Sequence, residues 1–331
     1  MMRQSITHVR PLGALSGMLA ALLVACFPPV QVTPPPAAAS AEVLAGAGAS
    51  VMIGAGDIAR CGWDGDEATA RLVDSVLRAD SVAGVDDAVF TVGDHAYPNG
   101  SDEEFERCFG ESWGDTTKGI MKKIFPAIGN HENNPAFGAP YYRYFGERAG
   151  PAGKGYYSYK LGEWHIVVLN SEMMTNSRYP SVERQAQLDW LRENLAENQT
   201  RCAIAYMHRP LFSSGGHGGE SGVRALWDIL FEEGVDVVLA GHEHHYERFA
   251  PMTPAGVRDT VRGIAQFIVG TGGADLRGLR SPAPNSVTRI QGHYGVLKLT
   301  LGAEEYRHAF LDPQGRVWDP GGGRCSEIPQ G

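Results

Sequence analysis

Five short segments carry aspartate, asparagine or histidine side chains immediately after runs of apolar residues. In chain order they contain Gly56-Asp57, Gly93-Asp94, Gly129-Asn130, Met207-His208 and Gly241-His242. Carboxylate, amide and imidazole groups are common donors to metal ions in proteins. A single aspartate after a strand is usually a helix cap, but oxygen or imidazole donors at five successive strand ends favour a metal site.

The apolar runs before these donors would position them. Six runs are expected to form buried strands, at 51–55, 88–92, 125–128, 166–169, 203–207 and 235–240. Amphipathic patterns between them predict helices over 66–77, 182–197 and 223–231. Because side chains at the carboxyl ends of adjacent strands face one crevice in an open α/β sheet, we expect the donors to converge.

The C-terminal part of the chain is rich in strand patterns. Runs at 265–269, 294–299 and 305–310 have no long helix between them and are expected to be antiparallel strands. A β–α alternation followed by such a tail predicts an α/β fold, with a two-sheet β-sandwich flanked by helices. The glycines at 321–323 predict a frayed end.

Taken in order, the motifs Gly-Asp, Gly-Asp-x-x-Tyr, Gly-Asn-His-Glu, Met-His-Arg-Pro and Gly-His-x-His-x-Tyr-Glu-Arg closely resemble those of the calcineurin-like metallophosphoesterases. Within that family they are most similar to the purple acid phosphatases, and the match extends from residue 51 to about 249. The resemblance implies hydrolysis of phosphate esters. A metal pair roughly 3.5–4 Å apart suits this reaction, since it can generate hydroxide and hold the phosphoryl oxygens.

The resemblance also implies the metal ligands, residue by residue. Two cations held close together need an anion between them, and Asp94 would bridge the pair. The other ligands of the first ion would be Asp57, Tyr97 and His244, and those of the second ion Asn130, His208 and His242. The sequence departs from the family at Ala59, where purple acid phosphatases commonly have glycine and many relatives have a ligating histidine.

Tyr97 decides which metal is expected. A tyrosine, with an ordinary pKa near ~10, binds as phenolate only where a cation stabilises the anion. A trivalent ion does so best, which favours Fe(III) paired with divalent Fe, Zn or Mn. Two carboxylates, the phenolate and a hydroxide would balance two divalent ions, whereas a trivalent–divalent pair keeps one positive charge to attract phosphate.

Two further histidines are candidates for substrate contact by the same resemblance. His131 would lie beside the metal pair and hold the phosphate or the leaving group; the alternative is support of the Asn130 turn. His217 matches a loop histidine that faces the substrate as a proton donor; the alternative is a solvated side chain. Other polar residues of the motifs are expected to support the site, namely His95, Glu132, Glu243, His245, Tyr246 and Arg248.

Composition excludes several classes of protein. The chain has 331 residues with 29 Lys+Arg against 38 Asp+Glu, a net charge of −9. A net-negative chain without basic blocks is a poor candidate for nucleic-acid binding, which depends on phosphate neutralisation. No C-x-x-C pair occurs, which argues against a zinc ribbon or a thioredoxin-type site.

The N-terminus predicts export and a lipid anchor. Arg3 and Arg10 precede an apolar run over 12–24 that is too short to span a bilayer comfortably. The run ends in Leu-Val-Ala-Cys26, which resembles the lipobox of a bacterial lipoprotein signal, with an ordinary secretory signal as the alternative. Residues 1–25 would then be removed, 26–50 would form a Pro/Ala-rich tether, and 51–331 the catalytic domain. The protein would be anchored at a bacterial membrane, facing the periplasm or the cell surface.

Four cysteines follow Cys26, at Cys61, Cys108, Cys202 and Cys325. In an exported protein this even number indicates two disulfides, for which three connectivities are possible. We favour Cys61–Cys108 and Cys202–Cys325, because Cys61 and Cys108 both lie in loops after the first two predicted strands. Buried free thiols are the alternative.

The sequence therefore predicts a lipid-tethered metallophosphoesterase that hydrolyses a phosphorylated small molecule, with phosphomonoesters as the expected substrates. Two alternatives remain open: a phosphodiesterase or nucleotidase of the same fold, and a non-catalytic surface module with structural metals. His131 argues against the module, which would not need a histidine outside the ligand set. The oligomeric state is left open, and the membrane is expected as a partner only through the lipid anchor.

Overall fold

The computed structural model describes residues 49–134 and 136–326. The predicted signal peptide, Cys26 and nearly all of the predicted tether lie outside these residues. Within the described ranges, no helix has the length and apolarity needed to cross a membrane.

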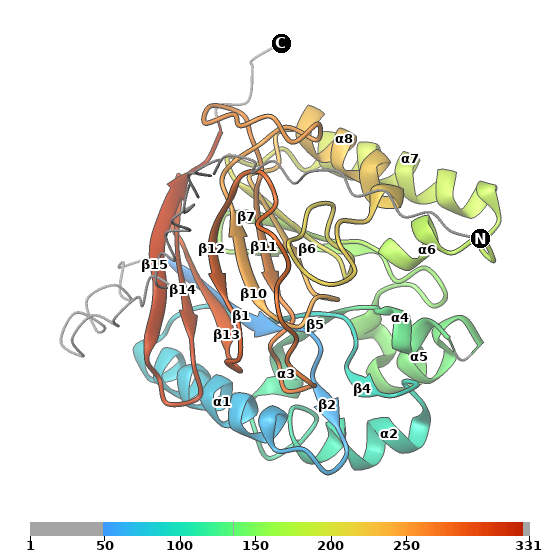
Figure 1. Ribbon diagram of the computed structural model, residues 1–331, viewed down its shortest axis with the longest axis vertical. Coiled ribbons are helices and arrows are strands. Elements are labelled where there is room, and N and C mark those ends of the chain that lie inside the picture. Colours follow the sequence, from blue (N-terminus) through green and yellow to red (C-terminus); the bar gives the residue numbers. More distant parts are fainter. Residues whose placement is uncertain (1–48, 135, 327–331) are drawn as a thin grey trace, which may run out of the picture. The chain divides into compact units, whose positions relative to one another are not determined.

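Two large β-sheets form the centre of the described region (Figure 1). The first has the strand order β15-β14-β13-β1-β3-β5. Its strands are β1 (Ser50–Ala55), β3 (Asp87–Val92), β5 (Ile124–Ala127), β13 (Val296–Leu301), β14 (Glu305–Leu311) and β15 (Val317–Arg324). The second has the order β12-β10-β11-β9-β8-β7-β6. Its strands are β6 (Tyr157–Leu161), β7 (Trp164–Val168), β8 (Ala203–Tyr206), β9 (Val237–Ala240), β10 (Tyr246–Phe249), β11 (Ala265–Val269) and β12 (Ser286–Ile290).

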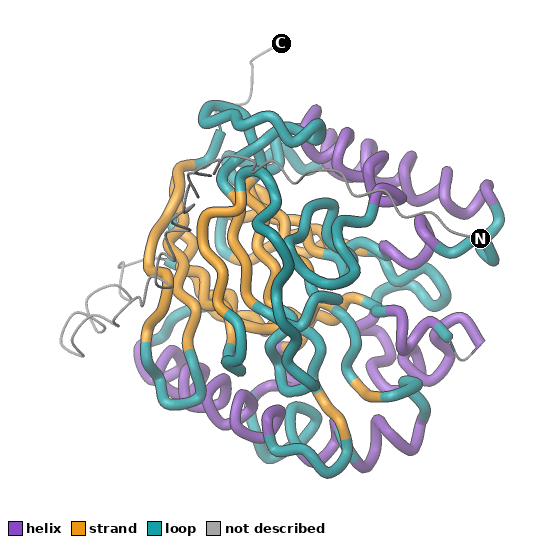
Figure 2. The backbone as a smooth tube through the Cα atoms, in the orientation of Figure 1, coloured by secondary structure: helices purple, strands orange, loops and turns teal. Residues whose placement is uncertain are grey.

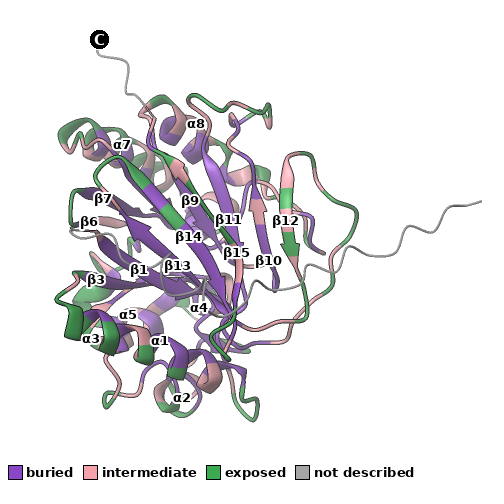
Figure 3. Cartoon of the chain, turned by 90° about the vertical axis from the view of Figure 1, so that its left-hand side faces the viewer, coloured by how far each residue is buried: buried purple, intermediate pink, exposed green. Residues whose placement is uncertain are grey.

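Apolar side chains from both sheets form one core between them, including Phe90 and Leu299 from the first sheet and Ile204 and Phe267 from the second. The outer face of the second sheet packs under helices α7 (Ser181–Glu197) and α8 (Arg224–Glu232), whose Leu191 and Trp227 belong to a second core. Helix α1 (Gly65–Ala83) covers the first sheet. Figure 2 shows these helices outside the strands, and Figure 3 shows that the central strands are mostly buried. The expected two-sheet sandwich flanked by helices is thus confirmed.

Shorter helices lie in the loops at the ends of the strands. They are α2 (Asp102–Arg107), α3 (Ile120–Lys123), α4 (Asn130–Asn133), α5 (Ala139–Phe145) and α6 (Ser171–Thr175). A two-stranded ribbon of β2 (Ala59–Arg60) and β4 (Ala96–Tyr97) joins the loops after β1 and β3. Ala59 therefore pairs with Ala96 and packs as a fully buried residue of this ribbon.

The sequence-based expectation for residues 265–269 was wrong in strand direction. This segment, β11, pairs parallel with β9 and antiparallel with β10. After β9 the chain forms β10 two places away in the sheet, and β11 then fills the place between β9 and β10. Two reversals of direction make the returning strand parallel to β9, which the spacing of apolar residues alone does not reveal.

The glycines at 321–323 also differ from expectation, because they belong to β15 and pair with β14 instead of fraying. A Cβ atom on Gly321 would lie 2.7 Å from the ring of His308, and one on Gly323 would lie 2.8 Å from the ring of Tyr306. Glycine is therefore required for close packing of β15 against these rings, so a glycine run here indicates close approach and not disorder.

Both favoured disulfides are present, Cys61–Cys108 and Cys202–Cys325. The first joins the loop after β2 to the end of α2. The second links the start of β8 to the residue after β15, and so ties the second sheet to the first across a sequence separation of 123 residues. Closing a loop of that size stabilises the fold by roughly 4–5 kcal/mol in a chain-entropy argument.

Candidate metal centre

The donor segments meet where strands of both sheets end. Asp57, Asp94 and Asn130 follow β1, β3 and β5 of the first sheet, whereas His208 and His242 follow β8 and β9 of the second. The expected convergence therefore takes place, and it takes place across the two sheets. Neither sheet alone carries the whole set of donors.

The donor turns are strained and tightly packed, and the lack of space explains why glycine precedes several of the donors. Asp57, Asp94 and His242 have φ values of 57°, 54° and 69°, in the left-handed region that non-glycine residues rarely adopt. Such backbone strain is concentrated at functional sites. The glycines give these turns room: a Cβ on Gly129 would lie 2.2 Å from Asp94 Oδ1, and one on Gly241 would lie 2.6 Å from Asp57 Oδ2.

The first cluster of donors surrounds the hydroxyl group of Tyr97. This oxygen lies 2.9 Å from Asp57 Oδ1, 3.1 Å from Asp94 Oδ2 and 3.1 Å from His244 Nε2. Nδ1 of His244 donates to the backbone carbonyl of Asp275, which leaves Nε2 as the ring nitrogen directed at the cluster. Burial lowers the pKa of His244, but the Asp57 carboxylate raises it above its ordinary value, so the metal-free site favours a proton on this ring. A cation could replace that proton, because the carboxylates, the hydroxyl oxygen and Nε2 all direct lone pairs to one position.

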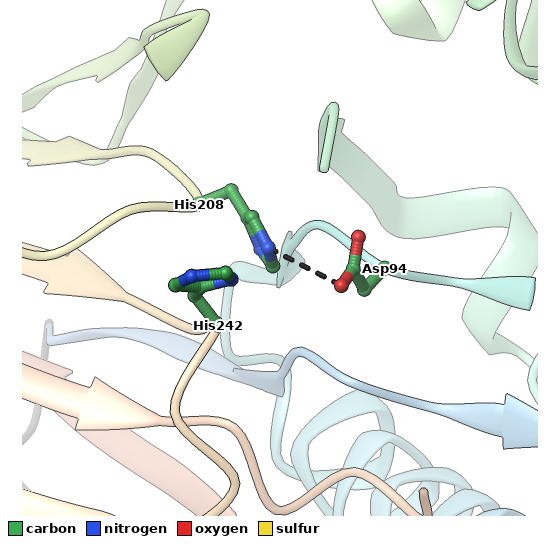
Figure 4. Close-up of side chains that lie close together, drawn as sticks. All are labelled: Asp94, His208 and His242. Carbon is green, nitrogen blue, oxygen red and sulfur yellow. Dashed lines mark ion pairs between the residues drawn. The ribbon is translucent and has the colours of Figure 1, made fainter. Parts of the chain in front are cut away.

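The second cluster shares Asp94 with the first. His208 Nε2 lies 3.0 Å from Asn130 Oδ1 and 3.3 Å from Asp94 Oδ2, while its Nδ1 donates to the carbonyl of Val92 at 2.7 Å. Donor atoms of Asp94, His208 and His242 lie within 4.8 Å of one another, and Figure 4 shows the two rings and the carboxylate side by side. A ring nitrogen fixed by a backbone carbonyl is the usual way of orienting a metal-binding histidine.

The charges of these buried groups respond to one another. Burial lowers the pKa of His208, but the carboxylates of Asp94, Asp57 and Glu172 together outweigh burial and raise it to about 10. Burial, together with the positive charges of His208 and Arg209, lowers the pKa of His242 to about 2. In the metal-free protein, a proton on His208 therefore supplies part of the positive charge that this carboxylate-rich site requires.

The same buried carboxylates keep the Tyr97 side chain uncharged. Burial and the neighbouring Asp57 and Asp94 carboxylates raise its pKa well above the ordinary value of 10.0. The phenol is therefore neutral in the metal-free protein, and only a strongly polarising cation could convert it to the phenolate.

Two buried glutamates support the donor loops, as expected from the sequence. Glu132 accepts backbone N–H groups of Asp94, His95 and Gly129 at 2.8, 2.7 and 3.0 Å, which holds two of the loops together. Glu243 accepts the N–H groups of His217 and Gly218, both at 2.8 Å.

The rings of His95 and His245 bond to residues outside the donor set. The His95 ring contacts Thr91 Oγ1 at 2.7 Å, and the His245 ring contacts Glu247 at 3.1 Å. The expectation for Tyr246 and Arg248 was wrong. Both side chains bond to Asp319 of β15, because they project from the same face of β10 toward the other sheet.

The two candidate substrate-contacting histidines lie at the accessible margin of the clusters. The His131 side chain is 28% exposed, with Nε2 3.7 Å from Asp94 Oδ2 and Nδ1 in contact with the Pro98 carbonyl. The His217 side chain is 46% exposed, and its ring centroid lies 4.6 Å from that of His242. Both are therefore near the donors without belonging to the two clusters.

Three residues that sequence reasoning did not single out also reach the site. Asp275 orients His244 through its carbonyl, and Arg277 Nη1 lies 3.4 Å from His217 Nε2. Arg209 Nη1 lies 3.1 Å from His242 Nε2. Only Arg209 has a signal in the sequence, its place directly after His208, whereas the other two come from a loop that tertiary folding brings to the site.

Two groups of potential ligands that share a carboxylate lie at the strand ends of a two-sheet sandwich, an arrangement that would suit a pair of metal ions. Comparison with known families agrees: the calcineurin-like phosphoesterase family model matches residues 52–246. The chain therefore belongs to the calcineurin-like phosphoesterase family, whose members hydrolyse phosphoric esters. That family and its purple acid phosphatases use dinuclear metal centres.

Similar proteins include human acid phosphatase type 7, which is 30% identical over 260 residues, covering 68% of this chain and 57% of the relative. An uncharacterized protein of Mycobacterium tuberculosis is 27% identical over 221 residues, covering 55% of this chain and 41% of that protein. The chain thus spans about half the length of these curated relatives.

Among solved structures, a purple acid phosphatase from yellow lupin seeds has the same fold, with a TM-score of 0.67, 20% identity and coverage of 84% of this chain and 54% of that one. GAP50, an anchor in the inner membrane complex of Plasmodium, aligns with a TM-score of 0.66 and 12% identity, covering 85% of this chain and 90% of that one. Since a fold can serve several functions, the functional argument must rest on the side chains.

Proposed function

We propose that the protein hydrolyses phosphomonoesters at a dinuclear metal centre of purple acid phosphatase type. The observation that carries this proposal is the pair of donor clusters that share Asp94, one of them built around a tyrosine hydroxyl. The similarity to acid phosphatases supports a phosphomonoester substrate.

In the proposed centre, the first ion would be held by Asp57, Tyr97, His244 and Asp94, and the second by Asn130, His208, His242 and Asp94. Asp94 suits the bridging role because its Oδ2 lies near both Tyr97 and His208. Its Oδ1 accepts the backbone N–H of His131 at 2.9 Å, which fixes the direction of the carboxylate. When bound, the metal pair supplies an activated water and the positive charge that holds phosphoryl oxygens.

His131 and His217 are the proposed substrate-contacting histidines. Nδ1 of His131 bonds to the Pro98 carbonyl, so Nε2 is the ring nitrogen that could contact the substrate. In its protonated form this nitrogen can donate to a phosphoryl oxygen or to the leaving oxygen. His217 is held at the other margin by Glu243 and Arg277, so the substrate would lie between the two rings.

We expect the isolated protein to be coloured, and Tyr97→Phe to remove the colour. A phenolate bound to Fe(III) absorbs visible light by charge transfer, and the substitution deletes only the hydroxyl that lies among Asp57, Asp94 and His244. Visible absorption spectra with elemental analysis of both proteins test this expectation. Tyr159→Phe is a control, because Tyr159 is a partly buried residue of β6 that stacks on Phe125 and belongs to neither donor cluster. A colourless, fully active enzyme that contains only divalent metal would show that Tyr97 does not select iron.

The proposed activity is tested by assays of the purified, metal-loaded protein against a chromogenic phosphomonoester, the corresponding diester and nucleotides. The proposal requires the highest kcat/KM for the monoester and two metal ions per chain. A clear preference for the diester or for nucleotides would instead favour the phosphodiesterase or nucleotidase alternative. No hydrolysis by the fully loaded protein would favour a non-catalytic surface protein.

We further propose that the protein is exported and anchored by a lipid on Cys26. The lipobox-like sequence and the Pro/Ala-rich segment after it support this location. Cys26→Ser should move the protein from the membrane fraction to the soluble fraction, because acyl chains would be its attachment. Fractionation with activity measurements tests this, and activity per molecule should not change. Equal membrane attachment of both forms would contradict the anchor.

A further inference from the structure

Arg209 lies at the edge of the second donor cluster in a fixed position. Its Nε and Nη2 atoms contact the two carboxylate oxygens of Glu172 at 2.6 and 3.1 Å, so the pair is bidentate. Glu172 comes from α6 and is only 2% exposed, and the Arg209 side chain is 19% exposed. Because planar bidentate pairing restricts the guanidinium, the remaining nitrogen, Nη1, has a defined direction before any ligand binds.

Nη1 of Arg209 faces the proposed centre. Nη1 lies 3.1 Å from His242 Nε2 and 3.9 Å from the Glu220 carboxylate, which is beyond hydrogen-bond distance. Arg209 also lines a cavity of about 420 Å³ together with Asn130, Asn176 and Glu220. The guanidinium therefore stands between the second cluster and a space open to a ligand.

Arg209 lies next to a residue of the proposed metal centre. Under the proposed function the His242 ring would be a ligand of the second ion, so Nη1, in contact with that ring, would stand close to an anion held at the centre. A guanidinium has five N–H groups and cannot be deprotonated in a protein. The side chain is 19% exposed beside the cavity, so an anion bound at the centre could reach Nη1 and accept a charge-assisted hydrogen bond.

We propose that Arg209 donates to the phosphoryl group of the substrate and makes the site selective for monoesters over diesters. A monoester has three non-bridging oxygens, of which the two ions can take up two, so the third remains for Arg209. In a diester this third position is an ester oxygen, a poorer acceptor that carries a substituent where the guanidinium stands. Glu172 is a positioning residue, since it acts only by holding Arg209. This inference rests on the proposed function.

The Arg209–Glu172 pair is better explained by such a role than by stability. Replacement of buried ion pairs by apolar residues is often neutral or stabilising, because the desolvation of both charges offsets their attraction. Here the pair lies beside a polar cavity and a proposed metal ligand, where a fixed positive charge can act on an anionic substrate.

Arg209→Gln and Arg209→Lys test the inference in the full-length, metal-loaded protein. We expect Arg209→Gln to lower kcat/KM for 4-nitrophenyl phosphate by roughly 100-fold, the scale for loss of one aligned donor. The loss for bis(4-nitrophenyl) phosphate should be less than about fivefold, because no donor contact is lost. Lysine keeps the charge but not the fork, so Arg209→Lys should fall between wild type and Arg209→Gln for the monoester.

A second measurement does not depend on turnover. Calorimetry with inorganic phosphate on the metal-loaded proteins should give a Kd that is at least ~10-fold higher for Arg209→Gln than for wild type. Metal content, from elemental analysis, should be equal. The control is Arg143→Gln, because Arg143 makes a similar bidentate pair with Asp102, at 3.1 and 2.6 Å, on an exposed surface. This control should change neither quantity.

Equal losses for the monoester and the diester, an unchanged phosphate Kd, or loss of metal from the Arg209 variants would each overturn the inference. Failure of the proposed function has a different signature. In that case the wild-type protein hydrolyses neither ester, while the phosphate Kd of wild type and Arg209→Gln still reports whether Arg209 contacts the anion.

Discussion

Replacing Asp94 with asparagine should lower kcat/KM for a phosphomonoester by at least ~10³-fold and release metal. Oδ2 of Asp94 lies 3.1 Å from the Tyr97 hydroxyl and 3.3 Å from His208 Nε2, so one carboxylate serves both clusters. The amide keeps the size of the side chain and can still accept the N–H of His131, but it removes the negative charge between the two ions. Metal ions at such centres contribute several kcal/mol of transition-state stabilisation, and each ~1.4 kcal/mol is a tenfold change in rate.

Elemental analysis and steady-state kinetics on the same preparations measure both parts of this expectation. Asp102→Asn is the matched control, since Asp102 is an exposed aspartate paired with Arg143 outside the donor clusters. The control should retain two ions and full activity. An Asp94→Asn protein with two ions and unchanged kcat/KM would show that Asp94 does not bridge.

His131→Ala should lower kcat by roughly 10²–10³-fold, or about 2.7–4 kcal/mol, and leave metal content unchanged. The side chain is not a proposed ligand, and its Nε2 lies 3.7 Å from Asp94 Oδ2 at the accessible margin of the site. Alanine retains the backbone N–H that bonds to Asp94 Oδ1 at 2.9 Å, so the bridging carboxylate keeps its orientation. The loss therefore reports contact with the transition state.

Single-turnover and steady-state kinetics separate the effect on kcat from an effect on KM, and elemental analysis follows the metals. His293→Ala serves as a histidine control, because His293 packs against Trp318 away from the donor clusters. If His131→Ala loses metal, the histidine supports the ligands; if only KM rises, it binds the substrate without acting in the chemical step.

Much of this arrangement could be predicted from the sequence because strand-end chemistry is local. An apolar run followed by glycine and a polar residue marks a buried strand that ends in a tight turn, and Asp57, Asp94 and Asn130 all follow this rule. The motifs also indicated the supporting role of Glu132, which bonds to the N–H groups of two donor loops. The disulfide pairing was predicted from the positions of Cys61 and Cys108 in successive strand-end loops, and the structure confirms it.

Other features depended on contacts between distant segments. The parallel direction of β11 follows from its return to the position beside β9, and the pairing of β15 follows from close packing of its glycines on Tyr306 and His308. Neither leaves a periodic signal in its own segment. For the same reason Tyr246 and Arg248, although part of a ligand motif, serve to link β10 to Asp319 of the other sheet.

The sequence by itself determined which residues can donate to metal ions, the strands that carry them and the family to which the chain belongs, since these are properties of residue types and short spacings. Tertiary structure alone decided that the donors form two clusters with Asp94 in common, because the clusters combine strand ends from both sheets. It also decided that Glu172 of α6 directs Arg209 toward His242. Such pairings depend on how the sheets and helices pack, and the spacing of residues along the chain does not record that packing.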